Sequence, residues 1–402
     1  MISLPPLSLY VHMPWCVRKC PYCDFNSHRA PEMLPQRDYV NALLEDLEVD
    51  LSFAMGRPLI SIFFGGGTPS LFTPDEIAAF LAGVRDRVEF MGDVEVTLEA
   101  NPGTIERGRF TGYRDAGVNR VSLGVQSFND EHLRVLGRIH SESDVERAIA
   151  ELKAARIDNF NLDLMYGLPN QTLEQAIYDV EHAIANSPAH ISHYQLTLEP
   201  GTAFHRRPPP LPDAELAWDM QIATQRLLAD ARYGQYEVSA YAREGQRCRH
   251  NLNYWEYGDY MGIGAGAHGK LTAASGEIVR TTRIRSPQRY LSSNASDRLE
   301  SRSIVAPEDL AFEFMLNALR LTEGTSASIF ERRTGLDRSN VSLELEHARR
   351  DGLLEIRGDR WLPTEFGRRF LNDLQERFLS SRAKPEPPDS TSRADVTERA
   401  SS

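Results

Sequence analysis

The sequence predicts an α/β protein: a partial (β/α)6 barrel followed by a smaller, mainly helical domain of winged-helix type. Three observations lead to this fold class. Strand-like and helix-like stretches alternate six times from residue 7 to about residue 235, as in a parallel sheet covered by helices. The alternation then stops, and glycine-rich and aromatic segments follow. The length of 402 residues also exceeds the size at which one core usually stops growing, so we expect two domains.

Each of the six units pairs a short apolar run with a stretch that carries apolar residues on one helical face. The expected strands are Leu7–Met13, Leu59–Phe64, Val94–Ala100, Arg120–Val125, Phe160–Tyr166 and His190–Leu198. The expected helices are Arg37–Phe53, Asp75–Arg87, Ile105–Asp115, Ser143–Ala155, Leu173–Ala185 and Ala214–Tyr233. Right-handed crossovers curl such a sheet toward a barrel, but six units fall short of the usual eight. We therefore expect a partly open barrel over residues 1–240.

The unusual residues follow the carboxyl ends of these strands, where β/α barrels carry their chemistry. Three cysteines follow the first strand, and a glycine run at 65–67 follows the second. The next three strand ends carry Glu99, Gln126 and Asp163. We therefore expect one mouth of the barrel to collect thiols, a glycine-rich backbone, an amide and two carboxylates.

The cysteines form the pattern CxxxCxxC, at Cys16, Cys20 and Cys23. Thiolates are the preferred ligands of iron–sulfur clusters, and three of them leave one iron of a [4Fe–4S] cubane open to a small molecule. The alternatives are incidental buried cysteines and a structural zinc site, although zinc sites favour CxxC pairs with a fourth ligand close by. Cys248 is expected to be a small buried residue rather than a fourth ligand. The spacing resembles the signature of the radical S-adenosylmethionine (SAM) superfamily, which implies that the open iron chelates SAM.

The other residues of the mouth each have a binding and a structural interpretation. The glycines let the backbone approach a ligand closely, or they form a tight turn. Glu99 and Asp163 are carboxylates in apolar strands, so each needs a partner: either polar groups of SAM or a salt bridge that closes the barrel. Gln126 either contacts the ligand or hydrogen-bonds a strand end. Arg138 has, by itself, the context of a surface arginine.

Residues 241–300 form a predicted connecting segment that contains the sequence HNLNYW, from His250 to Trp255. A neutral imidazole can ligate iron, and Tyr254 and Trp255 offer flat apolar faces, which together suit a haem site. The alternative is a hydrogen-bonded histidine in a capping segment, with the aromatic residues in the core. The same caution applies to His268, which lies between glycine-rich residues.

The last predicted domain covers residues 306–380. Its expected helices are Pro307–Leu321, Ser326–Thr334 and Ser339–Asp351, followed by a hairpin over 352–363 and a final helix from Thr364. This order resembles a winged-helix module, so a DNA-binding regulator is a competing interpretation. The net charge of −12 disfavours nucleic-acid binding, and we expect no nucleic-acid partner. Residues 381–402 are rich in serine, proline and charge, which predicts a disordered tail.

The remaining features of the sequence bear on location. There is no apolar run of membrane-spanning length and no charged-then-apolar leader. The few, clustered cysteines favour a reducing compartment. We expect a soluble cytoplasmic protein without a transmembrane segment, and the sequence leaves both a monomer and a homodimer open.

Taken together, the motifs resemble the family of oxygen-independent coproporphyrinogen III oxidases (HemN) with its haem chaperone branch (HemW), over nearly the whole chain apart from the tail. The resemblance rests on Tyr10 to Cys23, Gly65 to Pro69, Gly124 to Gln126 and Asp163 to Pro169. It implies that Tyr10, Cys16, Cys20, Tyr22 and Cys23 surround the cluster and SAM. The SAM contacts that it implies are Gly66, Gly67, Thr68, Glu99, Gln126, Arg138 and Asp163. A guanidinium is well suited to the SAM carboxylate, which favours a binding role for Arg138.

Two features distinguish the branches of this family. The oxidases carry a further cysteine two residues after the third, where this chain has Phe25, and the chaperone branch carries the pattern HNxxYW that begins here at His250. The resemblance therefore implies a haem chaperone that binds haem through His250 and passes it to haem-dependent proteins, such as respiratory enzymes. The alternative function is an oxygen-independent coproporphyrinogen III oxidase, a radical SAM decarboxylase of porphyrin synthesis.

Overall fold

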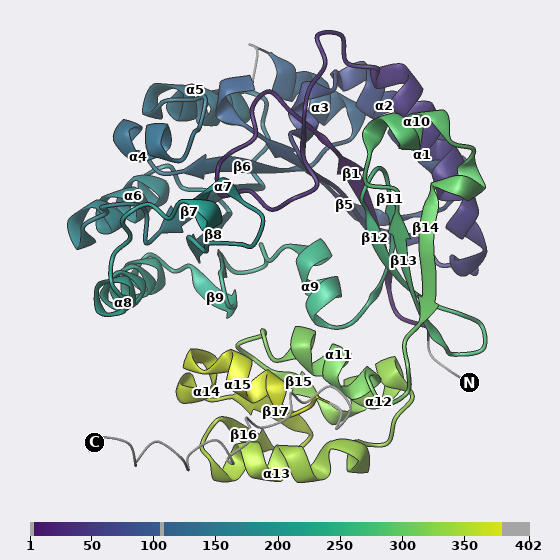
Figure 1. The fold of residues 1–402 in the computed structure, drawn as a ribbon, viewed down its shortest axis with the longest axis vertical. Coiled ribbons are helices and arrows are strands. Elements are labelled where there is room, and N and C mark those ends of the chain that lie inside the picture. Colours follow the sequence, from purple (N-terminus) through teal and green to yellow (C-terminus); the bar gives the residue numbers. More distant parts are fainter. Residues whose placement is uncertain (1–3, 105–107, 380–402) are drawn as a thin grey trace, which may run out of the picture.

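The computed structural model describes residues 4–104 and 108–379. A twelve-stranded sheet curves into an arc, and a smaller domain of helices with a three-stranded sheet lies against its open side (Figure 1). The predicted α/β fold class, with a smaller domain after the barrel, is confirmed. The tail that the sequence predicts to be disordered lies outside the described residues. Among the described residues, no helix is both long and apolar enough to cross a membrane.

Six parallel strands form the centre of the sheet, in the order β1-β4-β5-β6-β7-β8. They are β1 (Leu7–Met13), β4 (Leu59–Gly66), β5 (Phe90–Ala100), β6 (Arg120–Gln126), β7 (Phe160–Tyr166) and β8 (His190–Gln195). All six were expected. β8 ends before the predicted Leu198, because its partner β7 ends at Tyr166 and offers little further pairing. Two short strands, β2 (Trp15–Cys16) and β3 (His28–Arg29), pair with each other around the cysteine loop.

Helices cover the outer side of the arc (Figure 1). They are α1 (Gln36–Asp50), α2 (Pro74–Arg85), α3 (Arg109–Ala116), α5 (Glu142–Ala154), α6 (Leu173–Ala185) and α8 (Ala214–Asp230). Of the helix predicted over 105–115, the first three residues lie outside the described part of the chain. The structure adds two short helices, α4 (Asp130–Val135) and α7 (Ala203–Arg206), which are too short to show the helical period in the sequence.

The strands alternate between apolar and polar side chains, and this alternation separates the core from the barrel interior. The apolar set joins the helices in the main core: Leu7, Leu9, Val11, Val96, Leu98, Val121, Leu123, Leu162 and Leu164. The intervening set forms hydrogen bonds inside the barrel: Ser8, Ser61, Glu95, Ser122, Asn161, Asp163 and His190. Successive side chains of a strand point to opposite faces of a sheet. The barrel interior therefore carries a row of polar side chains on each of these strands.

The residues after 233 add more strands to the sheet than the sequence predicts. β9 (Gly234–Glu237) and β10 (Ala240–Ala242) extend the edge beside β8. β11 (Asp259–Ile263) pairs in parallel with β1, and β12 (His268–Thr272), β13 (Ile278–Arg283) and β14 (Leu299–Ile304) continue as antiparallel strands. Between these two sets, α9 (Arg249–Trp255) lies on the inner side of the arc (Figure 1). A short helix, α10 (Pro287–Ser292), packs near α1.

The smaller domain has the predicted order of three helices and a hairpin. Its helices are α11 (Leu310–Ala318), α12 (Ala327–Thr334), α13 (Ser342–Arg350), α14 (Glu365–Arg369) and α15 (Leu371–Glu376), and its strands are β15 (Thr325–Ser326), β16 (Leu354–Arg357) and β17 (Arg360–Pro363). A separate hydrophobic core holds these elements together. That core also contains Tyr257 and Ile278 of the preceding segment, so the two parts of the chain pack against each other. The domain boundaries given by the sequence stay a prediction.

Candidate functional site

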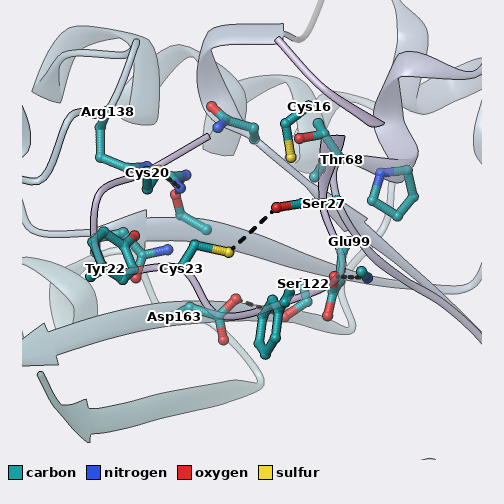
Figure 2. Close-up of a pocket in the computed structure, with 18 of the residues that line it drawn as sticks. Cys16, Cys20, Tyr22, Cys23, Ser27, Thr68, Glu99, Ser122, Arg138 and Asp163 are labelled. Carbon is teal, nitrogen blue, oxygen red and sulfur yellow. Dashed lines mark hydrogen bonds between the residues drawn. The ribbon is translucent and has the colours of Figure 1, made fainter. Parts of the chain in front are cut away.

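A cavity of about 340 Å³ opens at the carboxyl ends of the parallel strands (Figure 2). We call it the mouth cavity. Eleven residues named from the sequence line it: Cys16, Cys20, Tyr22, Cys23, Gly66, Gly67, Thr68, Glu99, Gln126, Arg138 and Asp163. All but Arg138 come from the cysteine loop after β1 and from the ends of β4 to β7, and strand order brings them together, because the carboxyl ends of parallel neighbours meet at one edge of the sheet. Arg138 comes from the segment between α4 and α5.

The cysteine loop presents three free thiols to the mouth cavity. Lys19 Nζ donates hydrogen bonds to the carbonyls of Phe25 and Ser27, which closes the loop on itself. Burial raises the pKa of the Cys16 and Cys23 thiols above their usual value. Within residues 4–104 and 108–379, no three His, Cys, Asp or Glu side chains converge on the position of a single metal ion. The sulfur atoms instead border a shared space.

The glycines after β4 are required by contacts within the protein. Gly66 has φ of +107°, and a Cβ atom there would lie 2.5 Å from the His12 ring. A Cβ atom on Gly67 would lie 2.6 Å from the Trp15 carbonyl oxygen. The backbone of β4 therefore packs directly against β1 and the start of the cysteine loop. This packing agrees with the alternative in which the fold itself requires the glycines. The same contact keeps the Gly66 and Gly67 backbone at the wall of the mouth cavity.

Glu99 and Asp163 are carboxylates that face the mouth cavity without an ion pair within the described residues, so the salt-bridge interpretation is wrong. Glu99 Oε2 accepts one hydrogen bond, from the Gly66 N–H at 3.2 Å. Burial and, next, the charge of Asp163 raise the Glu99 pKa to about 8. Asp163 accepts hydrogen bonds from Asn161 Nδ2 at 2.7 Å and Ser122 Oγ at 3.1 Å, and burial raises its pKa. Two facing carboxyl groups that lack a cation form a site that attracts one.

Gln126, at the end of β6, and Arg138 also line the mouth cavity. Gln126 has φ of +70°, unusual for a residue with a side chain, and the β6–β7 register shifts between Gly124 and Gln126. Its Oε1 accepts a hydrogen bond from the Tyr194 hydroxyl at 2.9 Å. Arg138 is not a surface residue: Nη2 donates to the Gly124 carbonyl at 2.8 Å, Nη1 lies 3.7 Å from Cys20 Sγ, and Nε is buried without a partner in the described chain.

Two of the residues to which the resemblance gives a binding role, Tyr10 and His250, lie outside the mouth cavity. The Tyr10 hydroxyl contacts His12 Nδ1 at 3.0 Å, and its ring lines a neighbouring cavity. His250 lies in α9 inside the barrel and is only 2% exposed. Its Nδ1 contacts Ser61 Oγ at 2.9 Å, and its ring centroid lies 5.0 Å from that of Phe63.

The remaining ring nitrogen of His250 is the atom that bears on function. Nε2 is buried and has no hydrogen-bond partner within the described residues. Burial, with the charge of Arg120 as the smaller cause, lowers the His250 pKa to about 3, so the ring is neutral. The Nδ1 contact agrees with a structural role for His250 as a hydrogen-bonded histidine. Nε2 is the atom that a ligand could use.

Sequence reasoning missed several polar residues that line the mouth cavity, chiefly Ser122, Ser192 and Tyr194. Ser192 on β8 is in register with Asp163 on β7 and so flanks it on the side away from Ser122. A signal was present on β6, whose sequence RVSLGVQ alternates polar or small residues with apolar ones, but not on β8, whose sequence is HISHYQ. Buried parallel strands usually read as continuous apolar runs, so polar residues at every second position indicate a polar interior.

The residues present fit an iron–sulfur cluster with SAM. The donor set is three thiols, which is the ligand type of such clusters. The mouth cavity also places two carboxyl groups and an unpaired guanidinium nitrogen around the remaining space. Those charges complement the ammonium and carboxylate of an amino-acid moiety.

Comparison with known proteins points to the same group of proteins along the whole chain. The model of the Radical SAM superfamily matches residues 10–183, and that of the HemN C-terminal domain matches residues 305–370. The heme chaperones HemW of Haemophilus influenzae and Escherichia coli are each 49% identical to this chain, over 94% of it and 100% of their own length. The mitochondrial radical S-adenosyl methionine domain-containing protein 1 of mouse is 40% identical over 69% of this chain and 64% of its own.

Among solved structures, the coproporphyrinogen III oxidase HemN of Escherichia coli, described as a radical SAM enzyme, has a similar fold. It superposes with a TM-score of 0.79 and covers 93% of this chain and 90% of its own. The sequences are 22% identical, so this likeness concerns the fold alone.

Proposed function

This chain belongs to the HemW family of radical SAM proteins, and we propose that it is a haem chaperone, which binds haem and transfers it to haem-dependent proteins. The observation that carries the proposal is the match to the haem chaperones, which extends over both the barrel and the smaller domain. Phe25 adds support, since the related oxidases have a cysteine at that position. Its side chain is 60% exposed and borders the mouth cavity.

The chain holds a [4Fe–4S] cluster and SAM as its cofactors. When bound, the cluster supplies an open iron site that chelates SAM. We propose that Cys16, Cys20 and Cys23 hold the cluster and that Arg138 binds the SAM carboxylate. We further propose that Glu99 and Asp163 receive the positively charged and hydroxyl groups of SAM, which would supply the cation that both side chains lack within the described residues. The backbone of Gly66, Gly67 and Thr68, with Tyr22 and Gln126, completes the wall of the mouth cavity around SAM.

We propose that haem binds beside α9, the helix that carries the HNxxYW pattern. His250 Nε2 is neutral and unpaired, which suits a metal ligand. Because His250 is buried inside the barrel, a direct bond to iron requires α9 to move outward. Without that movement, His250 supports the haem site from behind, through Tyr254 at a ring-centroid distance of 5.0 Å and Tyr10 at 6.4 Å.

We place the protein in the cytoplasm, where reduced thiols and an iron–sulfur cluster persist. Its proposed partners are apo forms of haem proteins, with respiratory enzymes as the first class to test.

The function is tested by haem transfer. Protein purified without air and loaded with haem is mixed with an apo haem enzyme, and recovery of that enzyme's activity is followed. We expect transfer to require the haem-loaded chaperone and to exceed the rate from an equal amount of haem on albumin. The same preparation is then incubated with coproporphyrinogen III, SAM and a reductant. Formation of protoporphyrinogen at enzymatic rates, without haem transfer, would overturn the proposal in favour of the oxidase.

The role of His250 is tested by the substitution His250→Ala. We expect weaker haem binding with unchanged iron and sulfide content, because the cluster thiols lie in a different element. Unchanged haem affinity and an unchanged Soret spectrum would falsify the assignment.

A further inference from the structure

A second cavity, of about 520 Å³, lies between α9, the cysteine loop and β12. We call it the α9 cavity. It shares Phe25, Gly66 and Glu99 with the mouth cavity, so the two spaces adjoin. Its volume falls within the range of roughly 300–1,000 Å³ that small-molecule and cofactor sites occupy. A ligand in the α9 cavity would therefore touch the wall of the mouth cavity.

The walls of the α9 cavity include aromatic rings. Tyr254 and Tyr260 lie side by side, with ring centroids 4.1 Å apart. Tyr10 lines the same space, and Phe25 lines it while staying 60% exposed. An exposed phenylalanine at a cavity rim offers a flat apolar surface that water does not satisfy. These rings suit a flat, largely apolar ligand.

His268, at the start of β12, lines the α9 cavity and is solvent-exposed. Within residues 4–104 and 108–379 its ring nitrogens have no hydrogen-bond partner. The other histidine of this cavity is different: both ring nitrogens of His12 are engaged, with the Tyr10 hydroxyl at 3.0 Å and the Asn26 carbonyl at 2.9 Å. His268 is therefore the imidazole on this wall whose nitrogens are free to bind a metal.

The α9 cavity is lined by both basic and acidic side chains. Arg285 is exposed, lines the α9 cavity and forms no ion pair within the described residues. Asp24 and Glu300 also reach the rim. Arg285 is close enough to His268 to lower its pKa, although partial burial is the larger cause. A ligand with both an iron atom and carboxylate groups would meet an imidazole and a guanidinium on one side of the cavity.

We infer that haem binds in the α9 cavity, with a ring nitrogen of His268 on the iron, its plane against Tyr254 and Phe25, and a propionate on Arg285. This inference rests on the proposed function as a haem chaperone. The bond forms from the lone pair of the neutral imidazole to the iron, with no change of oxidation state. His250 lies behind the same wall, against Tyr10 and Tyr254. In this structure His268 lines the α9 cavity and is exposed to a ligand there, whereas His250 is buried behind Tyr10 and Tyr254.

The test compares haem binding by the full-length wild type, His268→Ala, His250→Ala and the control His347→Ala, whose histidine lies on α13 away from both cavities. The readouts are the Soret spectrum and the rate of haem loss to apomyoglobin. We expect His268→Ala to change the Soret band and to speed haem loss at least tenfold, with the control unchanged. Free imidazole should restore the spectrum of His268→Ala, because an exposed position leaves room for it.

The outcomes separate this inference from the proposed function. If the wild type neither retains nor transfers haem, the proposed function fails and the inference fails with it. If the wild type retains haem and His268→Ala matches it in spectrum and rate, only the inference is overturned. Imidazole rescue of His250→Ala but not of His268→Ala would also overturn it and assign the iron to His250.

Arg285→Ala provides a second measurement, since an exposed arginine can be removed without unfolding the chain. We expect a severalfold faster loss of haem with an unchanged Soret maximum, because the propionate contact does not touch the iron. Haem dimethyl ester, which lacks the carboxylates, should be lost at the same rate from the wild type and from this variant. A difference between the two proteins with the ester would contradict the propionate contact.

Discussion

The barrel contains two groups of carboxylates that differ in their partners. At the mouth, Glu99 accepts a single hydrogen bond, from the Gly66 N–H, and has no cation within the described residues. At the start of β11, Asp259 is fully buried and accepts from Arg57 Nη1 at 2.8 Å and Lys270 Nζ at 3.0 Å. Thr272 adds hydrogen bonds from its backbone N–H and its hydroxyl.

The pKa values of the two carboxyl groups shift in opposite directions. Burial raises the pKa of both, but at Asp259 the charges of Lys270 and Arg57 outweigh it and hold the pKa below its usual value. At Glu99 the nearby Asp163 adds to the effect of burial, and the pKa rises to about 8. The structural carboxylate has its counter-charges within the chain, whereas the carboxylate of the mouth is left for a ligand to pair. The difference marks the binding site without reference to any relative.

The largest effect should come from the three thiols of the mouth. We expect the triple variant Cys16→Ala, Cys20→Ala, Cys23→Ala to lose the cluster completely, because no other thiol lines the mouth cavity in the described chain. Iron and sulfide analysis and the absorbance of anaerobically reconstituted protein measure this. The matched control is Cys248→Ala, which removes a buried cysteine outside the mouth cavity and should retain about four irons per chain. Retention of a full cluster by the triple variant would show that the mouth does not bind it.

The next largest effect should be the loss of stability when Asp259, the paired carboxylate, is removed. Asp259→Ala leaves Lys270, only 1% exposed, without its counter-charge. We expect the free energy of unfolding to fall by roughly 3–5 kcal/mol, the usual cost of breaking a buried pair. Urea denaturation measures it. Asp93→Ala is the control, because Asp93 pairs with Arg249 on the surface and its loss should change stability little. Equal stability of both variants would remove the distinction between the two carboxylate groups.

The third effect is a gain of stability, and it concerns Glu99. The unfolded chain releases the Glu99 proton near pH 4.5, whereas the folded chain keeps it until about pH 8. The folded state therefore loses stability as the pH rises from about 4.5 to 8, and Glu99→Gln removes this loss. We expect the cofactor-free variant to be more stable than the wild type at pH 8, by roughly 4 kcal/mol, and equal to it at pH 4. The same variant should bind SAM more weakly. Lower stability of Glu99→Gln at pH 8 would show that the carboxylate is already paired.

The smallest effect concerns the guanidinium of the mouth. Arg138→Lys keeps the positive charge but loses the planar fork that carboxylates bind in two places. We expect SAM affinity to fall about tenfold, or about 1.4 kcal/mol, with the cluster content unchanged. Equilibrium binding of SAM to the reconstituted protein measures it. An unchanged affinity would place the SAM carboxylate elsewhere.

Much of the mouth could be predicted from the sequence because its signals are local. Three cysteines within eight residues indicate a shared ligand, and strand ends follow from the length of each apolar run. Parallel order then brings Cys16, Glu99 and Asp163 to one edge without further information. The sequence left two interpretations of Glu99 and Asp163 open, contact with SAM or a salt bridge, because the partner of a carboxylate can lie far away in the sequence.

The later strands of the sheet and the position of His250 could not be predicted, because they depend on packing between distant segments. Strands β11 and β12 contain glycine, and β13 and β14 carry arginine and hydroxyl side chains instead of a clear apolar run, so the sequence showed a connecting segment where the structure has part of the sheet. The position of His250 inside the barrel follows from contacts with Ser61 and Glu95, on strands far earlier in the chain.

The sequence by itself determined the order of the parallel strands and the residues that meet at their carboxyl ends, since both depend on short-range periodicity and on a fixed side-chain direction. The tertiary structure decided which charged side chains are paired. It also decided that His250 is buried and that His268 lines a cavity. Those properties depend on distances between segments hundreds of residues apart, such as Asp46 and Arg283, whose buried pair joins α1 to β13.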